Sequence, residues 1–123
     1  MTSQKTILTI DDSRTMRDML RLTLTEAGYN VLQAADGLEG LAILRDVVPD
    51  AVITDINMPV LDGFGFIEKA RANERLRDVP ILVLTTESTP VMKDRARQAG
   101  ATGWITKPFD PEKLKSALMR VGA

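Results

Sequence analysis

The chain has neither cysteine nor histidine among its 123 residues. Without cysteine it cannot form disulfides or use a thiolate as a nucleophile or metal ligand, which fits a reducing compartment. Without histidine it cannot use Ser–His or Cys–His pairs, bind zinc through imidazole or phosphorylate itself on an imidazole. Any chemistry must therefore rely on Asp, Glu, Lys, Ser, Thr or a bound metal ion.

An excess of charge is also missing, because 16 basic and 17 acidic residues give a net charge of -1. Such a chain has no overall positive field to hold nucleic acid or anionic lipid, so we do not expect direct DNA binding. No window approaches the ~20 apolar residues of a membrane-spanning helix, and the N-terminus does not have the form of a signal peptide. We therefore expect a cytoplasmic protein with no membrane association. We also expect it to be monomeric, with one domain over residues 1–123.

Five short apolar runs alternate with stretches that carry helix signals. The predicted strands cover residues 6–10, 30–34, 51–54, 81–84 and 102–106. The predicted helices run from about 16 to 27, from Asp36 to 44, from about 64 to 72, from Thr89 to Gly100 and from Asp110 to 121. Asp36, Thr89 and Asp110 are the predicted N-caps, and a proline follows the last two. This alternation predicts an α/β fold of the (βα)5 type: a single doubly wound, five-stranded parallel sheet with helices on both faces.

Polar residues follow four of the five predicted strands. Asp11 and Asp12 follow the first, Asp55 the third, Thr85 the fourth and Lys107 the fifth. Each residue alone is equally well explained by a structural role, such as a turn cap for an acid or a solvated charge for the lysine. Because parallel strands bring their carboxyl ends to one edge, where ligands bind in open α/β sheets, the combination favours a shared site.

Three carboxylates brought together resist joint ionisation unless a cation compensates them. Mg²⁺ prefers hard oxygen ligands and retains several waters. We predict a magnesium site with Asp12, Asp55 and the main-chain carbonyl of Asn57 as direct ligands, and with Asp11 acting through water.

Lys107 and Thr85 complete a pocket for a phosphoryl group. The lysine would pair with one anionic oxygen and the threonine hydroxyl would donate to another. Asp55 lies at the centre of the constellation and is the candidate nucleophile, which would form an aspartyl-phosphate.

These motifs, taken in order along the chain, resemble the receiver domain of two-component response regulators. The matching segments are Asp11-Asp12, Asp55 with Met58-Pro59, Thr85, and Lys107-Pro108-Phe109. The resemblance covers essentially the whole chain and implies the flavodoxin-like strand order 2-1-3-4-5. It also implies a cis peptide bond between Lys107 and Pro108. It further implies that Asp55 accepts its phosphate from a phosphohistidine of a partner histidine kinase.

The same resemblance implies how the phosphoryl group is sensed. Thr85 would move toward it, and Trp104 on the fifth strand would change rotamer, which alters the face formed by the fourth helix, fifth strand and fifth helix. The alternative is that Trp104 is only a packing aromatic. Asn57 and Glu87 would tune how long the phosphoryl group survives by controlling the access of water.

Among receivers, the chain most resembles stand-alone chemotaxis regulators of the CheY type. The resemblance rests on Thr85-Thr86-Glu87-Ser88, on Asn57 and on Gly103-Trp104, and the chain runs from Met1 to the fifth helix. The implied partners are a chemotaxis histidine kinase, a flagellar motor switch protein and a phosphatase. One departure is Thr89-Pro90, where well-known members open the fourth helix with two lysines.

Three alternatives remain open. The chain could be a phosphate sink without an output partner, or a receiver cut from a longer regulator. It could also be a Mg²⁺-dependent phosphohydrolase of the haloacid-dehalogenase kind. Those enzymes need a second acid two residues after the nucleophile, where this chain has Asn57. We therefore expect a signalling protein with self-catalysed phosphotransfer and autodephosphorylation, and not an enzyme acting on a separate substrate.

Overall fold

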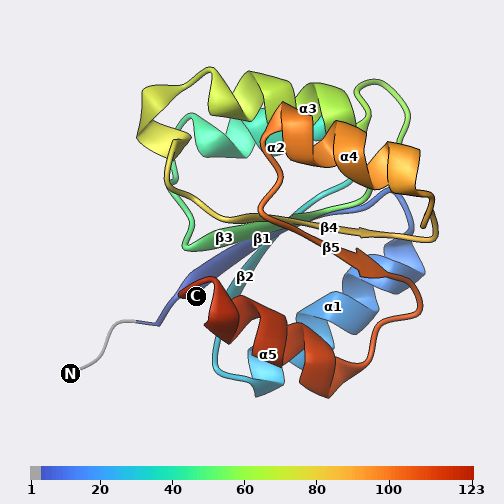
Figure 1. Ribbon diagram of the computed structural model, residues 1–123. Coiled ribbons are helices and arrows are strands. Elements are labelled where there is room, and N and C mark those ends of the chain that lie inside the picture. Colours follow the sequence, from blue (N-terminus) through green and yellow to red (C-terminus); the bar gives the residue numbers. More distant parts are fainter. Residues whose placement is uncertain (1–3) are drawn as a thin grey trace.

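The computed structural model describes residues 4–123, and in this part of the chain strands and helices alternate (Figure 1). The strands are β1 (Thr6–Ile10), β2 (Asn30–Ala34), β3 (Ala51–Thr54), β4 (Ile81–Thr85) and β5 (Gly103–Thr106). The helices are α1 (Arg14–Glu26), α2 (Gly37–Leu44), α3 (Gly63–Arg71), α4 (Pro90–Ala99) and α5 (Pro111–Arg120), with a short 3₁₀ helix, η1 (Glu74–Leu76). The predicted α/β alternation is confirmed.

The five strands form one parallel sheet in the order β2-β1-β3-β4-β5. This is the order that the family resemblance implied. After β1, the chain adds β2 along one edge of β1 and then returns to add β3 along its other edge. In such sheets the crevice outside the carboxyl ends of these two neighbouring strands is the usual ligand site.

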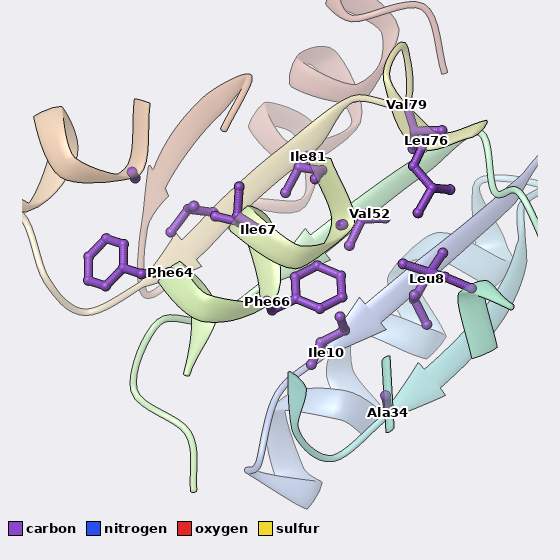
Figure 2. Packing of buried hydrophobic residues seen from close by; sticks show 14 of the residues in the cluster. Leu8, Ile10, Ala34, Val52, Phe64, Phe66, Ile67, Leu76, Val79 and Ile81 are labelled. Atoms are coloured by element: carbon purple, nitrogen blue, oxygen red, sulfur yellow. The ribbon is translucent and has the colours of Figure 1, made fainter. Parts of the chain in front are cut away.

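Helices cover both faces of the sheet: α2, α3 and α4 lie on one face, and α1 and α5 on the other (Figure 1). Alternate strand residues point to the two faces, so Leu8 and Ile10 pack with Phe66 on the first face, as Figure 2 shows. Ile7 packs with the cluster under α1 and α5 on the other face. Each fully buried side chain of this size contributes about 1.5–3 kcal/mol relative to its exposed state.

Side-chain oxygens cap the N-termini of all five α helices. Asp36, Thr89 and Asp110 are the caps that the sequence predicted. Ser13 and Asp62 cap α1 and α3 and were not predicted. Such caps typically contribute about 1 kcal/mol each. They also fix where each helix begins, directly after the loops that follow the strands.

Small differences from the predicted elements have local causes. Helix α3 begins one residue earlier than predicted, because Asp62 caps it by accepting a hydrogen bond from Gly65 N at 2.8 Å, and it ends at Arg71, one residue before the predicted end. Strand β5 begins after Thr102, whose hydroxyl oxygen instead accepts a hydrogen bond from Ile81 N at 3.0 Å. Helix η1 was not predicted, because three residues are too few to show a helical period.

In the described part of the chain, none of the helices combines the length and apolar character needed to cross a membrane.

Candidate functional site

The acidic residues that follow β1 and β3 come together at the carboxyl edge of the sheet. Asp55 N donates to the carbonyl of Ile10 at 2.9 Å, which extends the pairing of β1 and β3 and sets Asp11 beside Asp55. One carboxylate oxygen from each of Asp11, Asp12 and Asp55 lies within 4.8 Å of the other two. Asp11 is 1% exposed and Asp55 is 8% exposed, whereas Asp12 is exposed to solvent. The site is therefore an acidic cluster in which two carboxylates are buried and the third, that of Asp12, is open to solvent.

Lys107 lies between the two buried carboxylates. Its Nζ donates to Asp11 Oδ2 and to Asp55 Oδ2, each at 2.7 Å. The backbone holds the lysine at the end of β5, where its N–H donates to the carbonyl of Thr85 at 2.7 Å. The Lys107–Pro108 peptide bond is cis, as the resemblance implied. Lys107, at the end of β5, thus forms ion pairs with the acids that follow β1 and β3.

Two opposing effects act on the pKa of Lys107. Burial lowers the pKa because it disfavours the charged ammonium, but the hydrogen bonds and negative charges of Asp11 and Asp55 more than compensate. The net result is a pKa raised above the ordinary lysine value. Lys107 is therefore a fixed positive charge at neutral pH.

Backbone N–H groups fix the second oxygen of each buried carboxylate. Asp11 Oδ1 accepts from Ser13 N at 2.9 Å, and Asp55 Oδ1 accepts from Ile56 N at 2.6 Å. Arg17, which the sequence did not single out, donates from its guanidinium to the carbonyl of Asp11 at 2.6 Å. No local pattern marks this contact, since it depends on how α1 folds back over the end of β1. These contacts hold both carboxylates in one orientation before any ligand arrives.

The loops after β3 and β4 meet at the mouth of the pocket. Thr85 is fully buried at the end of β4, and its hydroxyl oxygen accepts from Glu87 N at 3.4 Å. Asn57 Nδ2 donates to Glu87 Oε1 at 3.3 Å. The two residues predicted to tune the phosphoryl lifetime therefore contact each other across the mouth.

Trp104 is linked to the same loop. It is partly buried on β5, and its Nε1 donates to the main-chain carbonyl of Glu87 at 3.1 Å. The indole also packs against the hydrophobic core. Glu87 therefore connects the two residues: its N–H donates to the Thr85 hydroxyl oxygen, and its carbonyl accepts from the Trp104 indole.

The donor set of the pocket fits Mg²⁺. Three carboxylates and one ammonium leave a formal excess of two negative charges, which one divalent cation would neutralise. All of the available donors are hard oxygen atoms, and the exposed Asp12 leaves room for retained waters. Asp11, Asp12 and Asp55 are the acids that the structure brings together where such an ion would be held. The direct role of the Asn57 carbonyl and the water-mediated role of Asp11 stay predictions.

Comparison with known proteins adds an independent line of information. Residues 7–119 match the family model described as the response regulator receiver domain. The chain is 40% identical over 114 residues to the chemotaxis protein CheY1 of Helicobacter pylori, which covers 91% of this chain and 92% of that protein. It is also 37% identical over 116 residues to the sensor histidine kinase CheAY of the same species. That match covers 93% of this chain but only 14% of the kinase.

Solved structures show the same fold. The structure of Vibrio cholerae CheY4 superposes with a TM-score of 0.93 at 44% identity, covering 97% of this chain and 99% of that one. The receiver domain of the sensor histidine kinase PA1611 from Pseudomonas aeruginosa superposes with a TM-score of 0.91 at 30% identity, covering 98% and 100%. In the crystal structure of the PA1611 receiver, a magnesium ion is coordinated in the active site cleft.

Proposed function

The chain belongs to the response regulator receiver domain family, and we propose that it accepts a phosphoryl group on Asp55 from the phosphohistidine of a histidine kinase, with Mg²⁺ as its cofactor. One observation carries the proposal: Lys107 Nζ lies 2.7 Å from both Asp11 and Asp55, in a pocket that also holds Asp12. This arrangement combines a nucleophilic carboxylate, a metal-binding acid pair and a fixed cation for a phosphoryl oxygen.

The reaction forms one bond and breaks one. A carboxylate oxygen of Asp55 attacks the phosphorus in line, the P–N bond to the donor imidazole breaks, and its electron pair stays on the imidazole nitrogen. Ile56 N holds Asp55 Oδ1, so the carboxylate is oriented before attack. Bound Mg²⁺ supplies charge neutralisation for the phosphoryl oxygens. Lys107 and the Thr85 hydroxyl are the protein groups that would pair with those oxygens.

The output is a change in a protein-binding face formed by α4, β5 and α5. Movement of Thr85 toward a phosphoryl oxygen would shift Glu87, to whose carbonyl Trp104 is hydrogen bonded. Trp104 lines a groove of about 190 Å³ between α4 and β5, together with Lys93 and Arg97 of α4. A rotamer change of the indole would therefore alter this groove directly.

Similarity to CheY proteins supports a place in cytoplasmic chemotaxis signalling. The proposed phosphodonor is then a chemotaxis kinase, the proposed output partner is a flagellar motor switch protein, and a phosphatase would end the signal. The chain spans less than half the length of some proteins that it matches, so these partners are proposals for the receiver alone.

Fluorescence of Trp104, the single tryptophan, provides the test. Mg²⁺ is added first, followed by beryllofluoride, which imitates the phosphoryl group. We expect a change in fluorescence at each step in the wild type and no beryllofluoride response in Asp55→Asn. An unresponsive wild type, or a variant that responds fully, would contradict the assigned pocket.

Partner binding is tested separately, because a phosphate sink would have the same pocket. Flagellar motor switch protein from the same organism is passed over immobilised chain with and without beryllofluoride. We expect retention only with beryllofluoride. Binding that is absent, or indifferent to beryllofluoride, would exclude the motor as the output and would favour the phosphate sink. Turnover of small phosphoesters would favour the phosphohydrolase, although Asn57 lacks the acid that such enzymes use.

A further inference from the structure

Asp12 is held in place differently from the other two acids of the cluster. The hydrogen bonds that residues 4–123 donate to the three clustered carboxylates go to Asp11 and Asp55, and none goes to Asp12. Asp12 is exposed to solvent, yet one of its carboxylate oxygens lies within 4.8 Å of oxygens of the two buried acids. Because the three negative charges repel one another, the main chain at Asp12 must keep this carboxylate near the others.

Arg17 of α1 holds the main chain at that point. Its Nη1 donates to the carbonyl oxygen of Asp11 at 2.6 Å, and this carbonyl belongs to the peptide group that joins Asp11 to Asp12. A charged donor forms hydrogen bonds that are shorter and roughly twice as strong as neutral ones. The peptide group lies beyond Ile10, the last paired residue of β1, so strand pairing does not fix its carbonyl. The contact with Arg17 therefore sets the plane of the peptide group from which Asp12 projects.

Strand β2 holds both sides of this contact. The carbonyl of Arg17 accepts from Gln33 Nε2 at 3.0 Å, and Asp11 N donates to the carbonyl of Ala34 at 3.1 Å. Arg17 N also donates to the carbonyl of Ser13 at 2.9 Å, within the first turn of α1. The guanidinium thus reaches the Asp11 carbonyl from a fixed backbone.

Arg17 does not act as a charge partner of the acids. None of the ion pairs found among residues 4–123 includes Arg17, and Lys107 is the cation that pairs with Asp11 and Asp55. A positive charge near a magnesium site weakens Mg²⁺ binding by repulsion, so charge and positioning make opposite predictions for the removal of the guanidinium. We expect the positioning effect to be larger, because the hydrogen bond acts in direct contact, whereas water and salt screen a charge that is partly exposed.

We propose that Arg17 is a positioning residue for the Mg²⁺ site: its hydrogen bond to the Asp11 carbonyl keeps the Asp12 carboxylate close to Asp11 and Asp55. The inference rests on the proposed function, in which Asp12 binds Mg²⁺ directly. Without the guanidinium, the peptide group is free to rotate, and repulsion moves the Asp12 carboxylate away from its neighbours. Mg²⁺ then has to restore the arrangement, which lowers its affinity. Once the ion is bound, the chemistry at Asp55 is unchanged.

The test removes the guanidinium from the full chain. Arg17→Met keeps an unbranched side chain with good helix propensity but has no N–H donor. In calorimetric titration we expect the Kd for Mg²⁺ to rise about fivefold, less than for Asp12→Ala, because a displaced ligand still binds in part. With acetyl phosphate as donor, the Mg²⁺ concentration that gives half the maximal rate should rise by the same factor. The rate at saturating Mg²⁺ should stay at the wild-type value, which general damage to the fold would not allow.

A double-mutant cycle shows whether Arg17 acts through Asp12. In the Asp12→Ala background, Arg17→Met should have no further effect on Mg²⁺ affinity, because the carboxylate that Arg17 positions is absent. Arg14→Met is the matched control, since it removes an equal charge from an exposed position in the first turn of the same helix. This control should bind Mg²⁺ at least as tightly as the wild type.

A second variant keeps the test decisive if Arg17→Met does not fold. Arg17→Gln also removes the charge, and its shorter side chain ends before the position of the arginine Nη1. It should weaken Mg²⁺ binding in the same direction as Arg17→Met. Circular dichroism and urea denaturation without Mg²⁺ show that each variant is folded at the temperature of the titration.

The possible results lead to different conclusions. An Mg²⁺ affinity of the Arg17 variants equal to or higher than that of the wild type would overturn the positioning role. An undiminished effect of Arg17→Met in the Asp12→Ala background would overturn it too, as would a rate at saturating Mg²⁺ that falls as far as the affinity. A wild type that binds no Mg²⁺, or takes no phosphate from acetyl phosphate, would instead overturn the proposed function.

Discussion

Lys107 Nζ lies 2.7 Å from Asp55 Oδ2, although the two residues are 52 positions apart in the chain. The same ammonium lies 2.7 Å from Asp11 Oδ2. The side chains of this cluster are largely shielded from solvent, with exposures of 11% for Lys107, 10% for Asp55 and 2% for Asp11. One positive charge thus holds two buried negative charges in the geometry that phosphoryl transfer would use.

Replacing Lys107 by alanine should lower the stability of the protein and its conformational response, but should leave phosphorylation possible. Without Mg²⁺, the two carboxylates would face each other uncompensated, so the free energy of unfolding should fall by about 2 kcal/mol. Phosphorylation by acetyl phosphate should remain possible, but the Trp104 fluorescence response to beryllofluoride should be reduced. Urea denaturation and fluorescence titration measure the two effects. Lys113→Ala, at an exposed position on α5, is the control and should change neither.

The contribution of Lys107 to stability should depend on pH in a defined direction. Because its pKa is raised in the folded state, the contribution is complete below the ordinary value of 10.5 and is lost as pH rises through the higher folded value. The difference in unfolding free energy between wild type and Lys107→Ala should be constant from pH 7 to 9 and shrink only at more alkaline pH. Tyr29, whose pKa burial also raises, is present in both proteins, so its effect cancels in the difference. A difference that shrinks below pH 9 would contradict the assigned pairing.

Removing the Asp12 carboxylate should weaken Mg²⁺ binding and should also reduce the repulsion among the three clustered carboxylates. Asp12→Ala should lower the affinity for Mg²⁺ by about tenfold or more, because Asp12 is a proposed direct ligand. In the absence of Mg²⁺, the variant should be at least as stable as the wild type, since one of three clustered carboxylates is gone. Calorimetric titration with Mg²⁺ and thermal unfolding test these two expectations. Asp18→Ala, an exposed acid farther along α1, should leave Mg²⁺ affinity unchanged.

Gly63, the first residue of α3, is expected to tolerate no side chain. A Cβ there would overlap the carbonyl oxygen of Asp55 and lie 2.8 Å from Ile56 Cα, and both are backbone atoms that cannot move aside alone. Gly63→Ala should reduce the free energy of unfolding by about 2 kcal/mol or more and weaken Mg²⁺ binding by displacing Asp55. Gly65→Ala is the matched control, since the one close neighbour of its Cβ would be the flexible end of the Leu61 side chain, at 2.7 Å, while Asp62 Oδ1 would lie at an ordinary 3.4 Å. Urea denaturation and calorimetric titration with Mg²⁺ compare the two variants. Equal losses in both would show that helix geometry, and not contact with Asp55, is the cause.

Local patterns determined much of this protein from the sequence alone. Apolar runs, caps and proline positions predicted five strands and five helices with boundaries close to those observed, because such signals act within a few residues. The parallel arrangement followed from strict alternation, and it placed Asp11, Asp55, Thr85 and Lys107 at one edge of the sheet. The strand order came from family resemblance, since the strands themselves do not specify their neighbours.

Tertiary structure decided the features that depend on distant segments. The bridge from Lys107 to two carboxylates, the contact of Asn57 with Glu87 and the hydrogen bond from Trp104 to Glu87 each join different loops or strands. Val60, in the loop after β3, is the clearest case, because its φ is +71° although valine disfavours positive φ, and the hydrogen bond between Leu61 and α2 holds the turn. The sequence by itself determined which chemical groups reach the carboxyl edge, since local periodicity sets where strands end. Only the packing of the elements decided which of these groups touch, because those contacts join residues far apart in the chain.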